Sequence, residues 1–153
     1  MEVRLTDAEC RLAASVGVAR RLDSLAAGRT EVYGSPTAGT AWDIDVEAAA
    51  GELAVAKALG RYWAPADDLA ADRRDGDVDG LQVRHTRRPD GCLICHQRDH
   101  DDHRFVLVVG AAPFFRVVGS ILGVDAKRPE HWRASAPRPA FFVAQQFLTP
   151  LAS

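Results

Sequence analysis

The feature that most constrains the fold is a change of pattern part-way along the chain, from helical signals to short apolar runs. Thr6 and Glu9 have the spacing of a capping box, in which two side chains satisfy backbone N–H groups at the start of a helix. Gly28 is the first strong stop signal that follows. This pattern predicts an amphipathic helix over residues 7–27.

A second helix is predicted over residues 45–59, with Gly60 as its stop. Segments rich in glycine, proline or acidic residues flank it, at 28–42 and 64–80. We predict that both segments are loops, and long loops inside compact domains are often functional.

Short apolar runs replace the helical pattern after residue 80. The runs that predict strands are 81–86, 92–96, 104–110, 115–122 and 141–144. Two helices followed by strands indicate an α+β (mixed α/β) domain. We expect two N-terminal helices packed on a mixed, largely antiparallel central sheet.

The length and composition fit one globular domain that spans residues 1–153, since 47% of the residues are hydrophobic and 26% are charged. Within it, the sheet is expected at 77–123 and a C-terminal segment at 124–153. No apolar run approaches the roughly 20 residues of a membrane span. The N-terminus has no apolar signal core, and three cysteines argue against a disulfide framework. These observations predict no membrane partner and a reducing cytoplasm.

Glu52 is the most informative polar residue of the second predicted helix. At 100° per residue it falls inside the apolar arc, which consists of Val46, Ala49, Leu53, Ala56 and Leu59. A carboxylate on a core-facing stripe is costly unless it is paired or bound to a metal. Glu52 is therefore a candidate metal ligand, and the alternative is a Glu at the edge of the stripe that pairs with an arginine.

An acidic turn, residues 75–80, follows with Asp75, Asp77 and Asp79 at alternate positions among glycines. It is similar to the start of a helix–loop–helix calcium loop, but the acid required six positions after the glycine is replaced by Thr86. A calcium site of that type is not expected. The turn is either a solvated loop or the source of one metal ligand, Asp77.

Gln82 and Arg84 lie two positions apart on the strand after this turn, so they share one face. Taken alone, this is the usual outer face of a half-buried strand. The pair gains interest from its position directly after the acidic turn and downstream of Glu52.

Together, Glu52, Asp77, Gln82 and Arg84 resemble the motif of the PD-(D/E)XK nuclease superfamily. That motif has a helix Glu, then an Asp at the start of one strand, then (Glu/Asp/Gln)-x-Lys on the next strand. Residues 51–56 and 77–84 are also similar to small phage-encoded proteins of high-GC hosts, and this similarity extends over 45–150. The resemblance implies a restriction-endonuclease-like core and a metal-dependent DNA nuclease, a hydrolase.

By the resemblance, Glu52, Asp77 and Gln82 hold Mg²⁺ or Mn²⁺, and Arg84 stands at the position of the motif lysine. Two departures bear on activity. Gln82 is a neutral ligand in place of a carboxylate, and Arg84 stays charged and cannot act as a base. The superfamily core also has a helix between its third and fourth strands, where this chain has only residues 96–103. The alternative function is a catalytically weak or inactive nuclease-fold protein that binds nucleic acid or a protein partner.

Residues 92–96 match the literal Cys-x-x-Cys-His pattern of haem attachment, and with His100 and His103 they have spacings seen in zinc sites. Haem attachment needs export, and Leu93-Ile94 favours a buried strand that places Cys92 and Cys95 on opposite faces. We predict free thiols with no zinc and no haem, and an antiparallel hairpin between this strand and residues 104–109.

The charge is uneven along the chain. Residues 1–103 have 13 Lys and Arg against 19 Asp and Glu, a net −6, and residues 104–153 have 6 against 2, a net +4. This division is compatible with a nuclease and equally with chance. Candidate DNA contacts are Arg87, Arg88, Lys127 and Arg128. The sequence leaves homodimer formation open.

Overall fold

A computed structural model describes residues 1–28, 41–65 and 76–151 of the protein. Most of the two predicted loops, 28–42 and 64–80, lies outside the described residues. The helices are α1 (Asp7–Ala26), α2 (Ala41–Ala58) and the short α3 (Gly123–Ala126). The strands are β1 (Glu2–Arg4), β2 (Leu81–Thr86), β3 (Leu93–Cys95), β4 (Arg104–Ala111), β5 (Phe114–Leu122), β6 (Trp132–Arg133) and β7 (Ala140–Val143).

The local helix signals behave as expected. Thr6 and Glu9 form the reciprocal capping box of α1, with the Thr6 N–H donating to Glu9 Oε2 at 2.6 Å. Gly28 and Gly60 follow the two helices with φ angles of +62° and +61°, the left-handed region that suits glycine. The second helix begins at least four residues earlier than predicted, since Ala41 is already helical.

The four-stranded sheet has the order β1-β5-β4-β2, with β2 parallel to β4 and the other pairs antiparallel. A small antiparallel sheet has the order β3-β7-β6. The protein is thus an α+β fold with two N-terminal helices packed on a mixed sheet, as predicted. β1 and β6 escaped sequence analysis because each has only two or three residues.

The predicted hairpin between residues 92–95 and 104–109 is wrong. β4 already pairs with β2 on one side and with β5 on the other, so β3 finds its partner in β7 instead. The parallel pairing of β2 and β4 also requires a crossover between them, and the chain of β3 forms part of that crossover.

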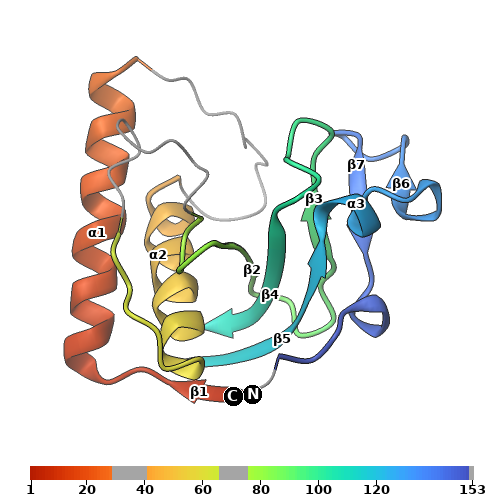
Figure 1. Ribbon diagram of the computed structural model, residues 1–153. Helices are drawn as coiled ribbons and strands as arrows, with labels where there is room; N and C mark the ends of the chain where they lie inside the picture. Colours follow the sequence, from red (N-terminus) through yellow and green to blue (C-terminus); the bar gives the residue numbers. More distant parts are fainter. Residues whose placement is uncertain (29–40, 66–75, 152–153) are drawn as a thin grey trace.

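The layers follow from the burial of β4 on both faces. Val106 and Val108 join the core cluster beneath the helices, whereas Phe105, Leu107 and Val109 join the cluster that contains β3 and β7. Figure 1 shows α1 as the outer layer, α2 between α1 and the larger sheet, and the small sheet on the far side. β2, at the edge of the larger sheet, also contacts α2.

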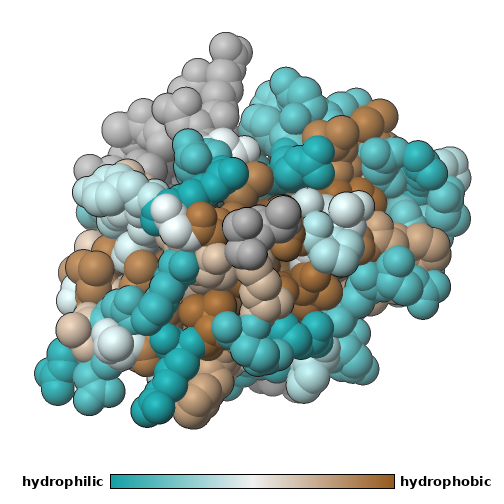
Figure 2. All heavy atoms as spheres, turned by 60° about the horizontal axis from the view of Figure 1, so that its bottom comes forward, coloured by the Kyte–Doolittle hydropathy of each residue, from teal (hydrophilic) through white to brown (hydrophobic). Residues whose placement is uncertain are grey.

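The surface keeps several large apolar side chains. Leu12, Leu22 and Leu25 on α1 and Phe114 on β5 are all at least 49% exposed. Figure 2 shows hydrophobic residues among hydrophilic ones on the face that lies at the bottom of Figure 1. Within the described residues, no helix is both long and apolar enough to cross a bilayer.

Candidate functional site

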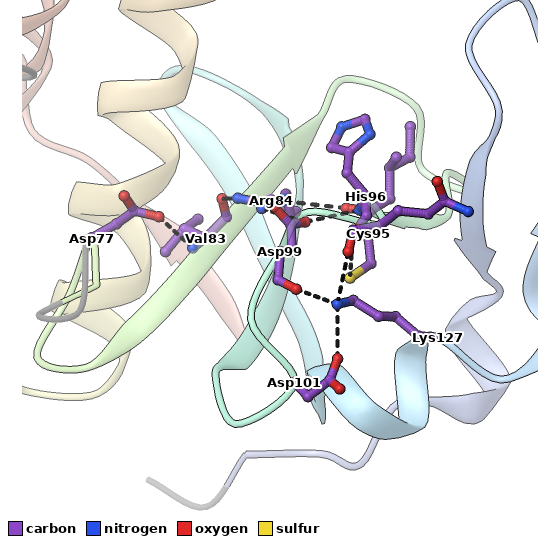
Figure 3. Close-up of polar contacts among 10 residues, drawn as sticks. Asp77, Val83, Arg84, Cys95, His96, Asp99, Asp101 and Lys127 are labelled. Atoms are coloured by element: carbon purple, nitrogen blue, oxygen red, sulfur yellow. Dashed lines mark hydrogen bonds and ion pairs between the residues drawn. The ribbon is translucent and has the colours of Figure 1, made fainter. Parts of the chain in front are cut away.

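Asp77 is fixed at the start of the edge strand β2. The backbone N–H of Asp77 donates to Leu81 O at 2.7 Å, which closes a tight turn. Its carboxylate Oδ2 accepts the N–H of Val83 at 2.7 Å, shown at the left of Figure 3. Since β2 is an edge strand, this bond holds the carboxylate at the edge of the sheet opposite β4.

Glu52 projects from α2 and is 6% exposed, so its predicted place on the core-facing stripe is confirmed. The Arg20 guanidinium forms a bidentate ion pair with the Glu52 carboxylate, with Nη1–Oε1 at 2.7 Å and Nη2–Oε2 at 2.8 Å. The Trp63 indole N–H donates to Oε2 at 3.1 Å. The alternative in which Glu52 pairs with an arginine is therefore observed, and that arginine comes from α1.

The environment of Glu52 disfavours its charged form. Burial raises the pKa of Glu52, and the negative charge of Asp77 raises it further. The hydrogen bonds from Arg20 and Trp63 lower this pKa without offsetting the rise. Two carboxylates that repel each other while one is buried form an arrangement that a cation stabilises.

Gln82 and Arg84 lie on the other face of β2. Leu81 and Val83 belong to the core cluster beneath the helices, and His85 lies against Gly51 of α2. Alternation along the strand turns Gln82 and Arg84 towards the small sheet. Gln82 is 8% exposed and lies one residue from the Asp77 turn. The structure thus places Glu52 and Gln82 on opposite faces of β2, with Asp77 at its edge.

Arg84 does not point towards Glu52, contrary to the prediction of a shared cleft. Its Nη2 donates to Asp99 Oδ2 at 3.0 Å, and its Nε donates to Ile94 O at 3.2 Å, as Figure 3 shows. The guanidinium carbon also lies 4.9 Å from the centre of the Phe105 ring. Arg84 therefore connects β2 to β3 and to the segment that follows β3.

The donor set suits a hard divalent cation, since Mg²⁺ and Mn²⁺ favour carboxylate and carbonyl oxygens. Glu52 and Asp77 offer carboxylates, whereas the Gln82 amide lies on the other face of β2. Within residues 1–28, 41–65 and 76–151, no three His, Cys, Asp or Glu side chains are grouped to hold a metal. The predicted set contains two residues of those types, Glu52 and Asp77. Its third member, Gln82, lies on the opposite face of β2 from Glu52, contrary to the predicted convergence of all three.

The four predicted DNA-contacting cations all have acidic partners. Arg87 pairs with Glu47, Arg88 with Asp90, Lys127 with Asp101 and Arg128 with Asp125. Lys127 also donates to the carbonyl oxygens of Gln97 and Asp99. To contact DNA, each of these cations must leave its acidic side chain and bind a phosphate instead. DNA contact by these residues stays a prediction.

The Cys-x-x-Cys-His segment is part of the small sheet. Cys95 ends β3 inside the core cluster with Leu93, whereas Cys92 precedes the strand and is half-buried. Cys10, Cys92 and Cys95 are free thiols. Burial raises the pKa of Cys95 to about 12, and nearby Asp99 adds to the rise. The expectation of no zinc and no haem stays a prediction.

A cavity of about 380 Å³ lies apart from Glu52 and Asp77, between β5, α3 and the last described turn. Arg104, Arg128, His131 and Phe147 are among its lining residues, and Glu52, Asp77 and Gln82 are not. Arg104 pairs in register with Leu81, so the cavity lies at the end of the sheet where β2 begins.

Three residues that contact the predicted site residues were not predicted from the sequence: Arg20, Trp63 and Asp99. Arg20 continues the buried face of α1 after Ala13 and Gly17, at helical spacing, and this was a usable signal. Trp63 and Asp99 follow helix and strand ends and have no periodic signal. Comparison of the chain with protein-family models, with curated proteins and with solved structures finds no match.

Proposed function

We propose that the protein is a metal-dependent nuclease that hydrolyses phosphodiester bonds of DNA, with Mg²⁺ or Mn²⁺ held by the carboxylates of Glu52 and Asp77. The observation that carries the proposal is a buried Glu52 within electrostatic reach of Asp77, which is anchored at the edge of the strand that carries Gln82. The resemblance of these residues to the PD-(D/E)XK motif supports the same assignment.

The bound cation would supply charge neutralisation at the phosphate and lower the pKa of a water. The chain's own residues orient the ligands. The Val83 N–H fixes the Asp77 carboxylate, and the Trp63 N–H fixes one oxygen of Glu52. Fixed ligands reduce the reorganisation required as charge develops on the phosphate. We also place the protein in a reducing cytoplasm, because its cysteines are free thiols.

Nicking of supercoiled plasmid in Mn²⁺ tests this function. We expect Asp77→Asn to slow nicking by about 10²–10³-fold, the usual cost of losing one electrostatic stabiliser. Asp79→Asn is the matched control, because it makes the same chemical change in the same turn at an exposed residue that pairs with Arg61. Nicking that survives Asp77→Asn, or that persists in excess chelator, would contradict the proposal.

The second candidate is a catalytically weak or inactive nuclease-fold protein that binds nucleic acid or a protein partner. Both oxygens of Glu52 are engaged by Arg20, and Arg84 is engaged by Asp99. Two of the four motif residues are thus already bonded to side chains of this same chain, which favours the second candidate. Titration calorimetry with Mn²⁺ and then with DNA separates the candidates, since DNA binding without metal uptake supports the second.

A further inference from the structure

We propose that Arg20, and not Arg84, is the cation that serves the carboxylate site, and that it competes with the divalent metal for Glu52. This inference rests on the proposed function. It assigns Arg20 as a positioning residue, whose guanidinium holds Glu52 in the absence of metal and is displaced or shifted when a metal binds.

The geometry of the pair carries the inference. The two bonds of 2.7 and 2.8 Å occupy one lone pair on each carboxylate oxygen, and the Trp63 indole takes a second on Oε2. One lone pair remains, on Oε1. A metal that binds Glu52 through both oxygens must therefore displace the two Arg20 hydrogen bonds. A metal that binds through Oε1 alone lies close to the positive charge of the Arg20 guanidinium.

Burial makes the competition strong. The Arg20 side chain is 14% exposed and the Glu52 side chain 8%, so water screens their charges poorly. Arg20 belongs to α1, which packs on α2 and does not belong to the sheet. Small movements of α1 against α2 would therefore change how tightly Arg20 holds Glu52.

Arg84 cannot take this role in the observed arrangement. It lies on the face of β2 turned away from α2, bonded to Asp99 and stacked on Phe105. Arg20 is instead in direct contact with a proposed ligand. A guanidinium released from Glu52 beside a metal is well suited to a phosphate oxygen, because its planar fork matches that geometry.

Mn²⁺ titration of four proteins tests the inference: wild type, Arg20→Gln, Arg20→Lys and Arg11→Gln. Arg11 is the matched control because it is exposed on the same helix and loses the same charge. We expect Arg20→Gln to bind Mn²⁺ at least about tenfold tighter than wild type, since a nearby positive charge opposes the ion. Arg20→Lys should fall between them, and Arg11→Gln should stay within about twofold of wild type.

Trp63 provides a second readout that needs no catalysis. In a background with Trp42→Phe and Trp132→Phe, its fluorescence should change with Mn²⁺ at the concentration that calorimetry gives. If wild type binds Mn²⁺ and Arg20→Gln binds no tighter than Arg11→Gln, the inference fails and the nuclease proposal stands. If neither wild type nor any variant binds Mn²⁺, both fail. Should Arg20→Gln not fold, Arg20→Lys decides, and affinity equal to wild type overturns the inference.

Discussion

Removal of Arg20 should destabilise the fold because it leaves the buried Glu52 carboxylate without its ion-pair partner. Glu52 keeps only the Trp63 N–H as a partner after Arg20→Gln, and its side chain is 8% exposed. Breaking a buried ion pair from one side costs about 3–5 kcal/mol. The wild-type Arg20 side chain is 14% exposed, and the Trp63 hydrogen bond to Glu52 remains in the variant. We therefore expect a loss at the lower end of this range, about 3 kcal/mol. For a chain of this size that corresponds to a fall of about 6–12 °C in Tm.

The assay is urea denaturation of wild type, Arg20→Gln, Arg11→Gln and the double variant Arg20→Gln/Glu52→Gln. Arg11→Gln should stay within about 0.5 kcal/mol of wild type, as exposed surface changes do. The double variant should be more stable than Arg20→Gln, because it leaves no unpaired charge in the core.

The pH dependence has a definite sign. Burial raises the folded-state pKa of Glu52 above the unfolded value, so the folded state holds its proton more tightly. Protonation then favours folding, and the contribution is lost as pH rises through the folded pKa. The loss caused by Arg20→Gln should therefore be smaller at pH 5 than at pH 8. An equal loss at both pH values, or a loss no larger than that of Arg11→Gln, would refute this reasoning.

Three further predictions concern other parts of the fold. Gly17→Ala should cost about 1–3 kcal/mol in urea denaturation, because the new Cβ would lie 2.4 Å from Val46 Cα where the helices cross, whereas Ser15→Ala on the exposed side should be near neutral. Cys95 should resist a thiol reagent at pH 8 until the protein unfolds, since burial raises its pKa to about 12; labelling of native Cys95 would contradict this. The pKa of Asp99 is lowered, because the opposing effect of burial is outweighed by the hydrogen bond from the His96 N–H and the charge of Arg84. Ionised Asp99 therefore stabilises the fold above the unfolded-state pKa, and this stabilisation is lost as pH falls through the folded-state pKa. Asp99→Asn should remove that acid dependence and cost about 1–3 kcal/mol, measured by urea denaturation from pH 7 down to pH 3.

Sequence reasoning succeeded where the signal is local. The capping box at Thr6 and Glu9 and the stop at Gly28 involve neighbouring residues, so the chain itself specifies them. Glu52 was placed on the buried face of its helix by periodicity alone. Each of these inferences needs only the geometry of one helix.

The errors arose where the partner is distant in sequence. β3 resembles the first strand of a hairpin, but its partner β7 comes later in the sequence than β4 and β5, which pair with each other. Arg20 lies 32 residues from Glu52 on another helix, and Arg84 lies 15 residues from Asp99, with β3 between them. Periodicity assigns a residue to a face and does not identify what lies opposite, so the ion pairs that define the site had to come from the structure.

The most direct test of the central claim is the anomalous scattering of Mn²⁺ in crystals of the protein soaked with that ion. We expect an anomalous peak within about 2.5 Å of carboxylate oxygens of both Glu52 and Asp77, the range of metal–oxygen bonds. The Arg20 guanidinium should have shifted from its two bonds to Glu52. A well-diffracting soaked crystal with Mn²⁺ elsewhere, or with no peak at these carboxylates, would contradict the account.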